Sequence, residues 1–194
     1  AVYSVGYYIY QYFMEFSMAI SGIFTPRIHN TITSYPDALE QRREITSLFV
    51  RVGRIQYLLL SLIATGILFF GVPFIKFWAG EGYETSYYVA VILVFFAFVP
   101  CIQNTGIEIQ RALNKHKFRS YVYFCMGMIN VAISVYSCQR FGAIGATIGM
   151  AVSLLLGNII VMNIYYHKKC NIDVLTFWKN ILQMSKGLLL PAAF

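Results

Sequence analysis

Long stretches without a single charged residue constrain this chain more than any other feature. Four such runs occur, and a fifth apolar stretch at the start of the chain is interrupted only by Glu15. A helix needs about 20 mostly apolar residues to cross a bilayer, and lipid offers no hydrogen-bond partners to free backbone groups, so runs of this length become helical there. The sequence therefore predicts five complete transmembrane helices, at residues 3–26, 55–75, 85–107, 120–139 and 141–166.

The composition agrees with a chain whose outer surface meets lipid. Hydrophobic residues make up 58% of it and charged residues 12%, whereas a soluble domain carries about 25% charged residues. A further apolar run begins at Gly187 and predicts the start of a sixth span. We therefore expect an all-α, polytopic membrane protein, and the apolar residues at both ends predict that it is part of a longer polypeptide.

The lysines and arginines orient these spans. The five connections carry, in order, five, one, four, one and four basic residues, which places 13 of the 15 on one side. This alternation follows the positive-inside rule, so the rich side is cytoplasmic and the first span runs inward from the outside. The net charge of +7 then follows from topology, and no nucleic-acid partner is expected.

Two amphipathic segments are predicted on the cytoplasmic side. Residues 38–54 have apolar positions at helical spacing, which predicts an extension of the second span near the headgroups. Residues 173–184 repeat this pattern and predict an interfacial connector. The residues expected on the apolar face of the first segment are Leu39, Ile45, Leu48, Phe49 and Val52.

These features divide the chain into three parts. Residues 1–165 are expected to be part of one transmembrane bundle, 166–186 a cytoplasmic amphipathic connector, and 187–194 the start of a further transmembrane helix.

Glu15 is the one charged residue well inside a predicted span. A charge at mid-bilayer costs at least about 2.5 kcal/mol, so we expect its side chain to face a bundle interior or a water-filled cavity. There it could bind a proton or a cation and couple ions to transport. The alternative is a purely structural salt bridge or polar contact, and the sequence leaves both open.

Arg27 and Arg54 stand at the cytoplasmic ends of the first two spans. Either guanidinium could contact a substrate phosphate or an anionic headgroup, because arginine binds such groups bidentately. The favoured alternative is an ordinary anchor of the positive-inside kind.

Small residues recur every four positions on the fifth span. Such a face lets two helix backbones approach closely, and packing within the chain is favoured over a homodimer interface. The residues of this face are Gly145, Gly149, Ser153 and Gly157.

Polar residues in the spans give no catalytic pattern. The amides could line a hydrophilic cavity or link helices, and the cysteines and histidines form no cluster or motif, so no metal site, cofactor, disulfide or enzyme activity is expected. The residues concerned are Asn104, Asn130, Asn158, Asn163, Cys101, Cys125, Cys138, Cys170, His29, His116 and His167.

Three stretches resemble a known family. They are NTGIEIQRALNKHKFRS at 104–120, FGAIGATIG at 141–149 and NIYYHKK at 163–169. They are similar to the polysaccharide transporter family of bacteria, the Wzx-type flippases of lipid-linked oligosaccharides. The resemblance implies a fold like that of the MATE multidrug exporters and peptidoglycan-lipid flippases, with two six-helix bundles around a central cavity. A place in the second, C-terminal bundle is preferred, although a start at helix two fits the charge alternation equally well.

The function that this resemblance implies is transport across the bacterial inner membrane. The substrate would be an undecaprenyl-pyrophosphate-linked oligosaccharide for O-antigen, capsule or exopolysaccharide synthesis, with a proton or sodium ion as coupling ion. Contacts with polysaccharide assembly proteins are also implied. Two alternatives stay open: a MATE-like exporter of drugs or small molecules, and a non-transporting membrane protein of envelope assembly.

Overall fold

The computed structural model describes residues 1–35, 37–170 and 172–192, with side chains to residue 186 in the last helix. The described part is all-helical, with about 90% of residues in helices and no strand, which confirms the predicted class. Its elements are α1 (Val2–Ile23), α2 (Thr25–Ser34), α3 (Ala38–Ala79), α4 (Glu84–Ile102), α5 (Thr105–Ala112), α6 (Lys117–Phe141), α7 (Ala143–Ser153), the π-helix η1 (Leu154–Val161), α8 (Met162–Lys169) and α9 (Val174–Ala192).

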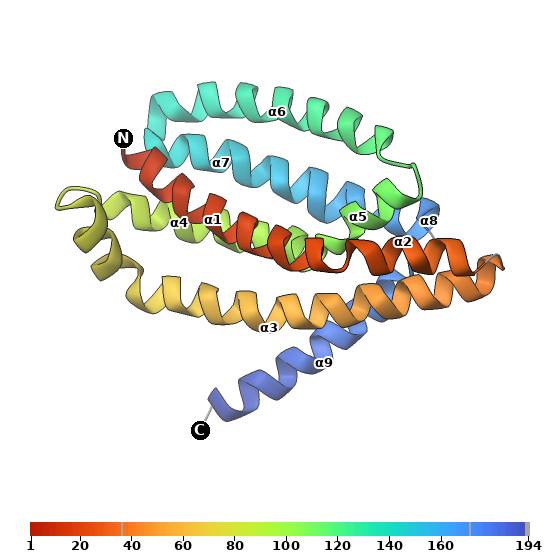
Figure 1. Cartoon of the computed structure of the whole chain (residues 1–194). Helices are drawn as coiled ribbons and strands as arrows, with labels where there is room; N and C mark the ends of the chain where they lie inside the picture. Colours follow the sequence, from red (N-terminus) through yellow and green to blue (C-terminus); the bar gives the residue numbers. More distant parts are fainter. Residues whose placement is uncertain (36, 171, 193–194) are drawn as a thin grey trace.

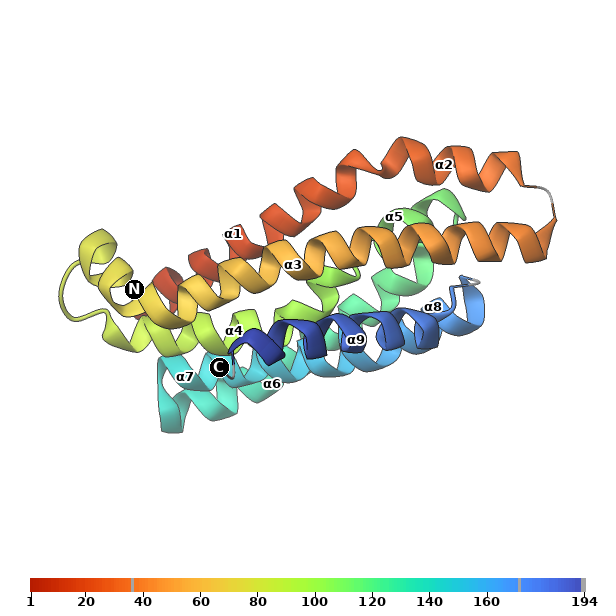
Figure 2. The same cartoon turned by 90° about the horizontal axis from the view of Figure 1, so that it is seen from below.

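The long helices run back and forth along one axis (Figure 1). The turns between α3 and α4 and between α6 and α7 lie at one end, while α2, α5 and α8 lie at the other (Figure 2). The second end carries most of the basic residues, as the charge alternation predicts. Buried side chains of α1, α3, α4 and η1 form a continuous core with those of α8 and α9.

Four helices are long and apolar enough to cross a membrane: Ala38–Ala79, Glu84–Ile102, Lys117–Phe141 and Ala143–Lys169. They correspond to the second to fifth predicted spans. α1 has 22 residues but does not reach the same apolarity, because five tyrosines, Gln11 and Glu15 lower its mean hydropathy. It nevertheless packs along α4. The first predicted span, at 3–26, therefore stays a prediction.

α3 joins the predicted amphipathic segment and the second span in one helix of 42 residues. Its length is about 60 Å, roughly twice the thickness of the hydrocarbon core, so its first turns extend beyond the apolar region. Asp37 caps its start by accepting a hydrogen bond from the backbone N–H of Glu40 (3.4 Å). Of the predicted apolar face, Leu39 is exposed, whereas the other four residues are buried.

The third predicted span, 85–107, ends earlier than expected. α4 stops at Ile102 and α5 starts at Thr105, with Gln103 and Asn104 between them. Pro100 lies in the last turn of α4, where it removes one helical hydrogen bond. Both amide side chains are buried, so protein encloses this irregular backbone, as is required wherever such backbone lies within a bilayer.

α9 combines the predicted connector and the start of the predicted sixth span in a single helix. Its Phe177 is fully buried and packs on Phe49 of α3 with ring centroids 4.7 Å apart. This contact holds the first turns of α9 against α3. Residues 193–194, the end of the predicted sixth span, lie outside the described residues.

Candidate functional site

A cavity of about 360 Å³ lies between α1, α4, α6 and η1, and it reaches α5 and α8. Five methionines form much of its wall, and amides from three elements supply polar groups. The polar lining residues are Gln103, Asn104, Asn130, Ser153, Asn158, Arg119, Tyr10, Tyr123 and Tyr166. Three of the four asparagines whose role the sequence left open therefore face one cavity.

Arg119 is the charged residue of this cavity and is only 9% exposed. Its Nε donates to Oε1 of Gln110 (2.7 Å), and its two terminal nitrogens donate to the hydroxyls of Tyr123 and Tyr166. The guanidinium carbon also lies 5.3 Å and 5.8 Å from the centroids of these two rings. All of these partners are neutral.

The positive charge of the buried Arg119 guanidinium has no negatively charged partner among the described residues. Arginine stays protonated in proteins, and a buried charge is normally paired because removing it from water is costly. Among the described residues the side-chain ion pairs are Lys76–Glu84 and Arg111–Glu108, and neither includes Arg119. Its charge is therefore available to an anion that enters the cavity.

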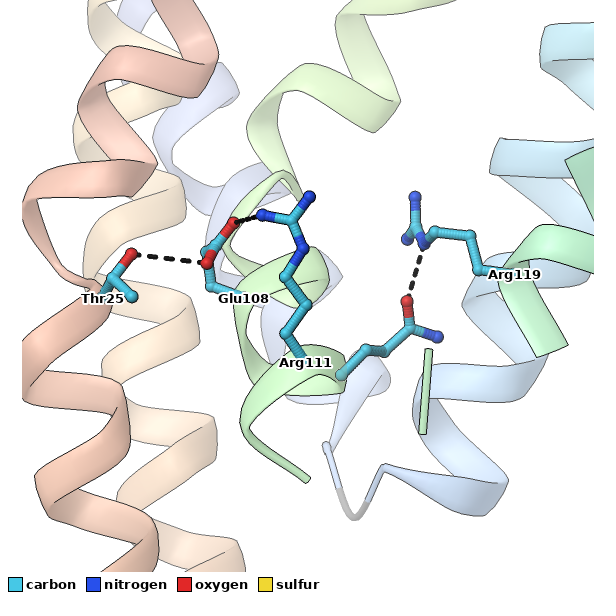
Figure 3. A network of polar contacts seen from close by, with 5 residues as sticks. Thr25, Glu108, Arg111 and Arg119 are labelled. Atoms are coloured by element: carbon cyan, nitrogen blue, oxygen red, sulfur yellow. Dashed lines mark hydrogen bonds and ion pairs between the residues drawn. The ribbon is translucent and has the colours of Figure 1, made fainter. Parts of the chain in front are cut away.

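The nearest acidic residue in sequence, Glu108, is already engaged. Its carboxylate accepts from Arg111 (2.7 Å) and from the hydroxyl of Thr25 (3.4 Å). Figure 3 shows this group separated from Arg119, whose guanidinium points to Gln110 instead. α5 therefore carries an ion pair on the side that faces Thr25 of α2, and it also carries the amide that holds Arg119.

The position of Arg119 depends on a close contact between α5 and α8. Tyr166 is buried, and a Cβ atom on Gly106 would lie only 2.6 Å from its ring. Only glycine leaves room for that ring. Tyr123 extends the network by donating to Oδ1 of Asn158 (3.1 Å) in η1, so Arg119 connects α5, α6, α8 and the π-helix.

A second polar network joins α1, α3 and the α4–α5 break. Gln56 donates to the hydroxyl of Ser21 (2.7 Å) and to the carbonyl of Ser17 (3.1 Å). Asn104 donates to the hydroxyl of Ser17 (3.0 Å), which in turn donates to the carbonyl of Cys101 (2.7 Å). All five residues are buried, so these bonds fix the wall of the cavity beside Asn104.

Asn163 has a different role from the other asparagines. It exchanges hydrogen bonds with Gln103 (2.9 and 3.0 Å) and accepts from the indole of Trp178 (3.1 Å). This amide therefore links the α4–α5 break to α9.

Glu15 does not line the cavity. Its side chain lies on the exposed face of α1 and accepts a hydrogen bond from Gln11 (3.0 Å). Within the described residues its side chain therefore faces away from the interior of this bundle. Its role in ion coupling stays a prediction.

Arg27 and Arg54 also lie away from the cavity. Arg27 is exposed on α2, and Arg54 is exposed on α3, where it donates to Oδ1 of Asn180 in α9. From the sequence, Arg119 was counted only as one of the four basic residues in the cytoplasmic connection between the third and fourth spans. No local signal distinguishes it, because its burial comes from Gln110, Tyr123 and Tyr166 on three different helices.

The small-residue face of the fifth span lies against α6. Cβ atoms on Gly145, Gly149 and Gly157 would lie 2.3 Å from the carbonyl of Ser137, 2.1 Å from Oγ of Ser134 and 2.8 Å from Cγ of Met126, respectively. Ser153 donates to the carbonyl of Met126 (3.0 Å). These close contacts bring Asn130 and Asn158 to the cavity from adjacent helices.

No group of three or more metal-ligating side chains occurs in the described part of the chain. The four cysteines are unpaired, two of them buried and two exposed. Burial raises the pKa of the Cys170 thiol to about 11, so this thiol is protonated at neutral pH and is a poor nucleophile.

The chain has no significant match among known protein families, curated proteins or solved structures. What the fold defines is an all-helical protein with four helices fit to span a membrane, which indicates a membrane protein. The site adds a cavity whose largely apolar wall carries several amides and one charged residue, Arg119.

Proposed function

We propose that this chain is part of a transporter that moves an undecaprenyl-pyrophosphate-linked oligosaccharide across the bacterial inner membrane. The observation that carries the proposal is Arg119, a buried cation with neutral partners, in a cavity between membrane helices. A guanidinium in this environment favours a phosphate, which it can contact through two parallel hydrogen bonds.

The rest of the lining suits the sugar part of such a substrate. Amides both donate and accept hydrogen bonds, and Asn104, Asn130 and Asn158 present them to the cavity. The methionine side chains are flexible and adapt to irregular shapes. The volume, about 360 Å³, lies at the low end for ligand pockets, so it fits a headgroup portion of the substrate.

Two irregular elements line the cavity that holds Arg119, and both could bend during a conformational step of transport. The α4–α5 break and η1 both contribute to the cavity wall, and π-helical turns are frequent at functional sites. In our proposal these two elements absorb the bending as one bundle rocks against another, as in alternating access. A proton or sodium gradient supplies the driving force.

A MATE-like exporter of small molecules is the second candidate. The methionine-rich wall favours it, because such surfaces accept diverse apolar ligands. Arg119 distinguishes the two functions: it attracts an anionic substrate and repels the cationic compounds that an exporter of cations would carry.

The test is transport by the intact protein in lipid vesicles. The substrate is a fluorescent polyprenyl-pyrophosphate-linked sugar, and the variants are Arg119→Gln and Arg119→Lys. We expect Arg119→Gln to lower the transport rate about tenfold or more, which corresponds to about 1.4 kcal/mol. Arg119→Lys should retain part of the rate, because it keeps the charge but loses the bidentate contact.

The matched control is Lys117→Gln, which removes an exposed charge two residues away on the same helix and should leave transport unchanged. Each variant is compared with the wild type by thermal unfolding. Normal transport by a folded Arg119→Gln protein would contradict the proposal, and export of cationic small molecules by the wild type, undiminished in Arg119→Gln, would favour the second candidate.

A further inference from the structure

Four arginines of α3 line one cleft at the surface between α3 and α9. The cleft has a volume of about 720 Å³ and is separate from the cavity of Arg119. It extends over about three turns of α3, roughly 18 Å along the helix axis. The arginines are Arg42, Arg43, Arg51 and Arg54, and all of them are exposed.

The cleft has a large excess of positive charge. Its one acidic lining residue is Asp173, and that carboxylate already accepts from the backbone N–H groups of Leu175 (3.1 Å) and Thr176 (3.2 Å) and from the hydroxyl of Thr176 (2.7 Å). None of the four arginines belongs to an ion pair of the described residues. The charge of the cleft is therefore not neutralised by the chain that forms it.

Neutral polar groups complete the lining. Thr46 and Ser47 come from α3, and Thr176 and Asn180 come from α9. Asn180 accepts from Arg54 and so holds one guanidinium at the mouth of the cleft. Hydroxyls and guanidinium groups together are the usual donors to phosphate oxygens.

The cleft lies where the apolar part of α3 begins. Arg54 directly precedes the charge-free run of 55–75, and the cleft is on the half of α3 that extends toward α2 and α5 (Figure 2). The next two turns of α3 after the cleft expose apolar side chains, namely Ile55, Leu58 and Leu62. A charged cleft thus continues into an apolar surface at the expected depth of the headgroups.

We propose that this cleft binds the phosphate headgroup of an anionic membrane lipid, whose acyl chains lie along the exposed apolar surface of α3. Basic clusters next to a membrane span attract anionic headgroups, and each basic residue adds to the attraction. The bound lipid contacts both α3 and α9, so it holds the two helices together. This site is independent of substrate transport through the Arg119 cavity.

The test is native mass spectrometry of the intact protein with equal amounts of phosphatidylglycerol and phosphatidylcholine. The wild type should retain phosphatidylglycerol preferentially. Arg43→Gln/Arg51→Gln should lower the ratio of bound phosphatidylglycerol to phosphatidylcholine about tenfold or more, since two charges are lost. Arg42→Gln/Arg54→Gln, which removes the other pair, should lower it as well.

The matched control is Lys117→Gln/Lys168→Gln, which removes two exposed charges at the same end of the molecule but outside the cleft. It should keep the wild-type ratio. An equal fall in this control, or no lipid preference in the wild type, would overturn the proposal.

A last measurement distinguishes a lipid headgroup from free inorganic phosphate as the ligand of the cleft. Excess inorganic phosphate at constant ionic strength should leave the lipid ratio unchanged, because it lacks the acyl chains that contact α3. Release of the lipid by inorganic phosphate would assign the cleft to a soluble anion and overturn the lipid site.

Discussion

Gln110 Oε1 lies 2.7 Å from Nε of Arg119 and accepts its hydrogen bond, although the two residues belong to different helices. Both side chains are buried. The amide satisfies the guanidinium geometrically but leaves its charge in place. A carboxylate at the same position would accept the same hydrogen bond and would also neutralise the charge of Arg119.

The first prediction rests on this difference between an amide and a carboxylate at position 110. Gln110→Glu is nearly isosteric and would give Arg119 an ion-pair partner in the existing geometry, so the protein should remain folded. Transport of the pyrophosphate-linked substrate should fall about tenfold or more, because the new carboxylate competes with the phosphate. The measurement is transport in vesicles, with thermal unfolding as the check on folding.

Gln183→Glu is its control, since Gln183 is exposed on α9 and undergoes the same change of charge. If Gln110→Glu transports normally, the anion-binding role of Arg119 is wrong.

The second prediction concerns the contact between Gly106 and Tyr166. Gly106→Ala places a Cβ atom 2.6 Å from the Tyr166 ring, and such overpacking costs about 1–3 kcal/mol. We expect a lower unfolding temperature in detergent. Gly127→Ala is the matched control, because nothing lies within 4 Å of its Cβ position and alanine is the better helix former. Equal stabilities of the two variants would disprove the close contact.

The third prediction concerns ion coupling. Glu15→Gln should lower transport and remove its dependence on a proton or sodium gradient, because the amide cannot bind the coupling ion as a carboxylate does. Gln11 can still donate to the new amide oxygen, so the local structure is preserved. Glu81→Gln, in the exposed turn before α4, should have no effect. Unchanged gradient dependence in Glu15→Gln would rule out this role.

The fourth prediction follows from the capping of α9. The hydroxyl of Thr176, which donates to Asp173, lowers the pKa of this carboxyl below its usual value. The ionised carboxylate therefore stabilises the start of α9 above pH of about 4, and this contribution is lost as the pH falls through the lowered pKa. Asp173→Ala should cost about 1 kcal/mol at neutral pH.

Thermal unfolding at several pH values measures this effect. The difference between wild type and Asp173→Ala should be constant near neutral pH and shrink in acid. Glu44→Ala, which removes an exposed carboxylate of α3, should show no such difference. A difference that grows in acid would contradict the assignment.

The fifth prediction tests the orientation. In a variant without the two exposed cysteines, Cys125 and Cys138, Glu81→Cys should react with a membrane-impermeant thiol reagent from outside the cell. His116→Cys should react only after the membrane is opened, because it lies at the basic end. Labelling in the reverse order would invert the topology.

Local sequence patterns predicted much of the fold. The charge-free runs located the four helices that are fit to span a membrane, and the amphipathic spacing located the first turns of α3 and α9. These features depend on the hydropathy of consecutive residues, so they can be read from the chain itself. The two-bundle fold and the first predicted span, at 3–26, stay predictions.

The candidate site was predicted only in its parts. The asparagines were recognised as polar residues within spans, but their common cavity depends on the α4–α5 break and on close packing of α6 with α7 and η1. Glu15 was expected to face a bundle interior or a water-filled cavity, and it lies on an exposed face of α1. The direction of one side chain on a helix depends on which neighbours pack there, and the chain's own periodicity does not contain that information.

The sequence by itself determined that this protein is helical, rich in segments long and apolar enough to span a membrane, and basic at one end, because hydropathy and charge act locally along the chain. Only the tertiary structure decided that Arg119 is buried. Its partners come from α5, α6 and α8, and a buried charge is tolerated where hydrogen bonds from several helices converge on it.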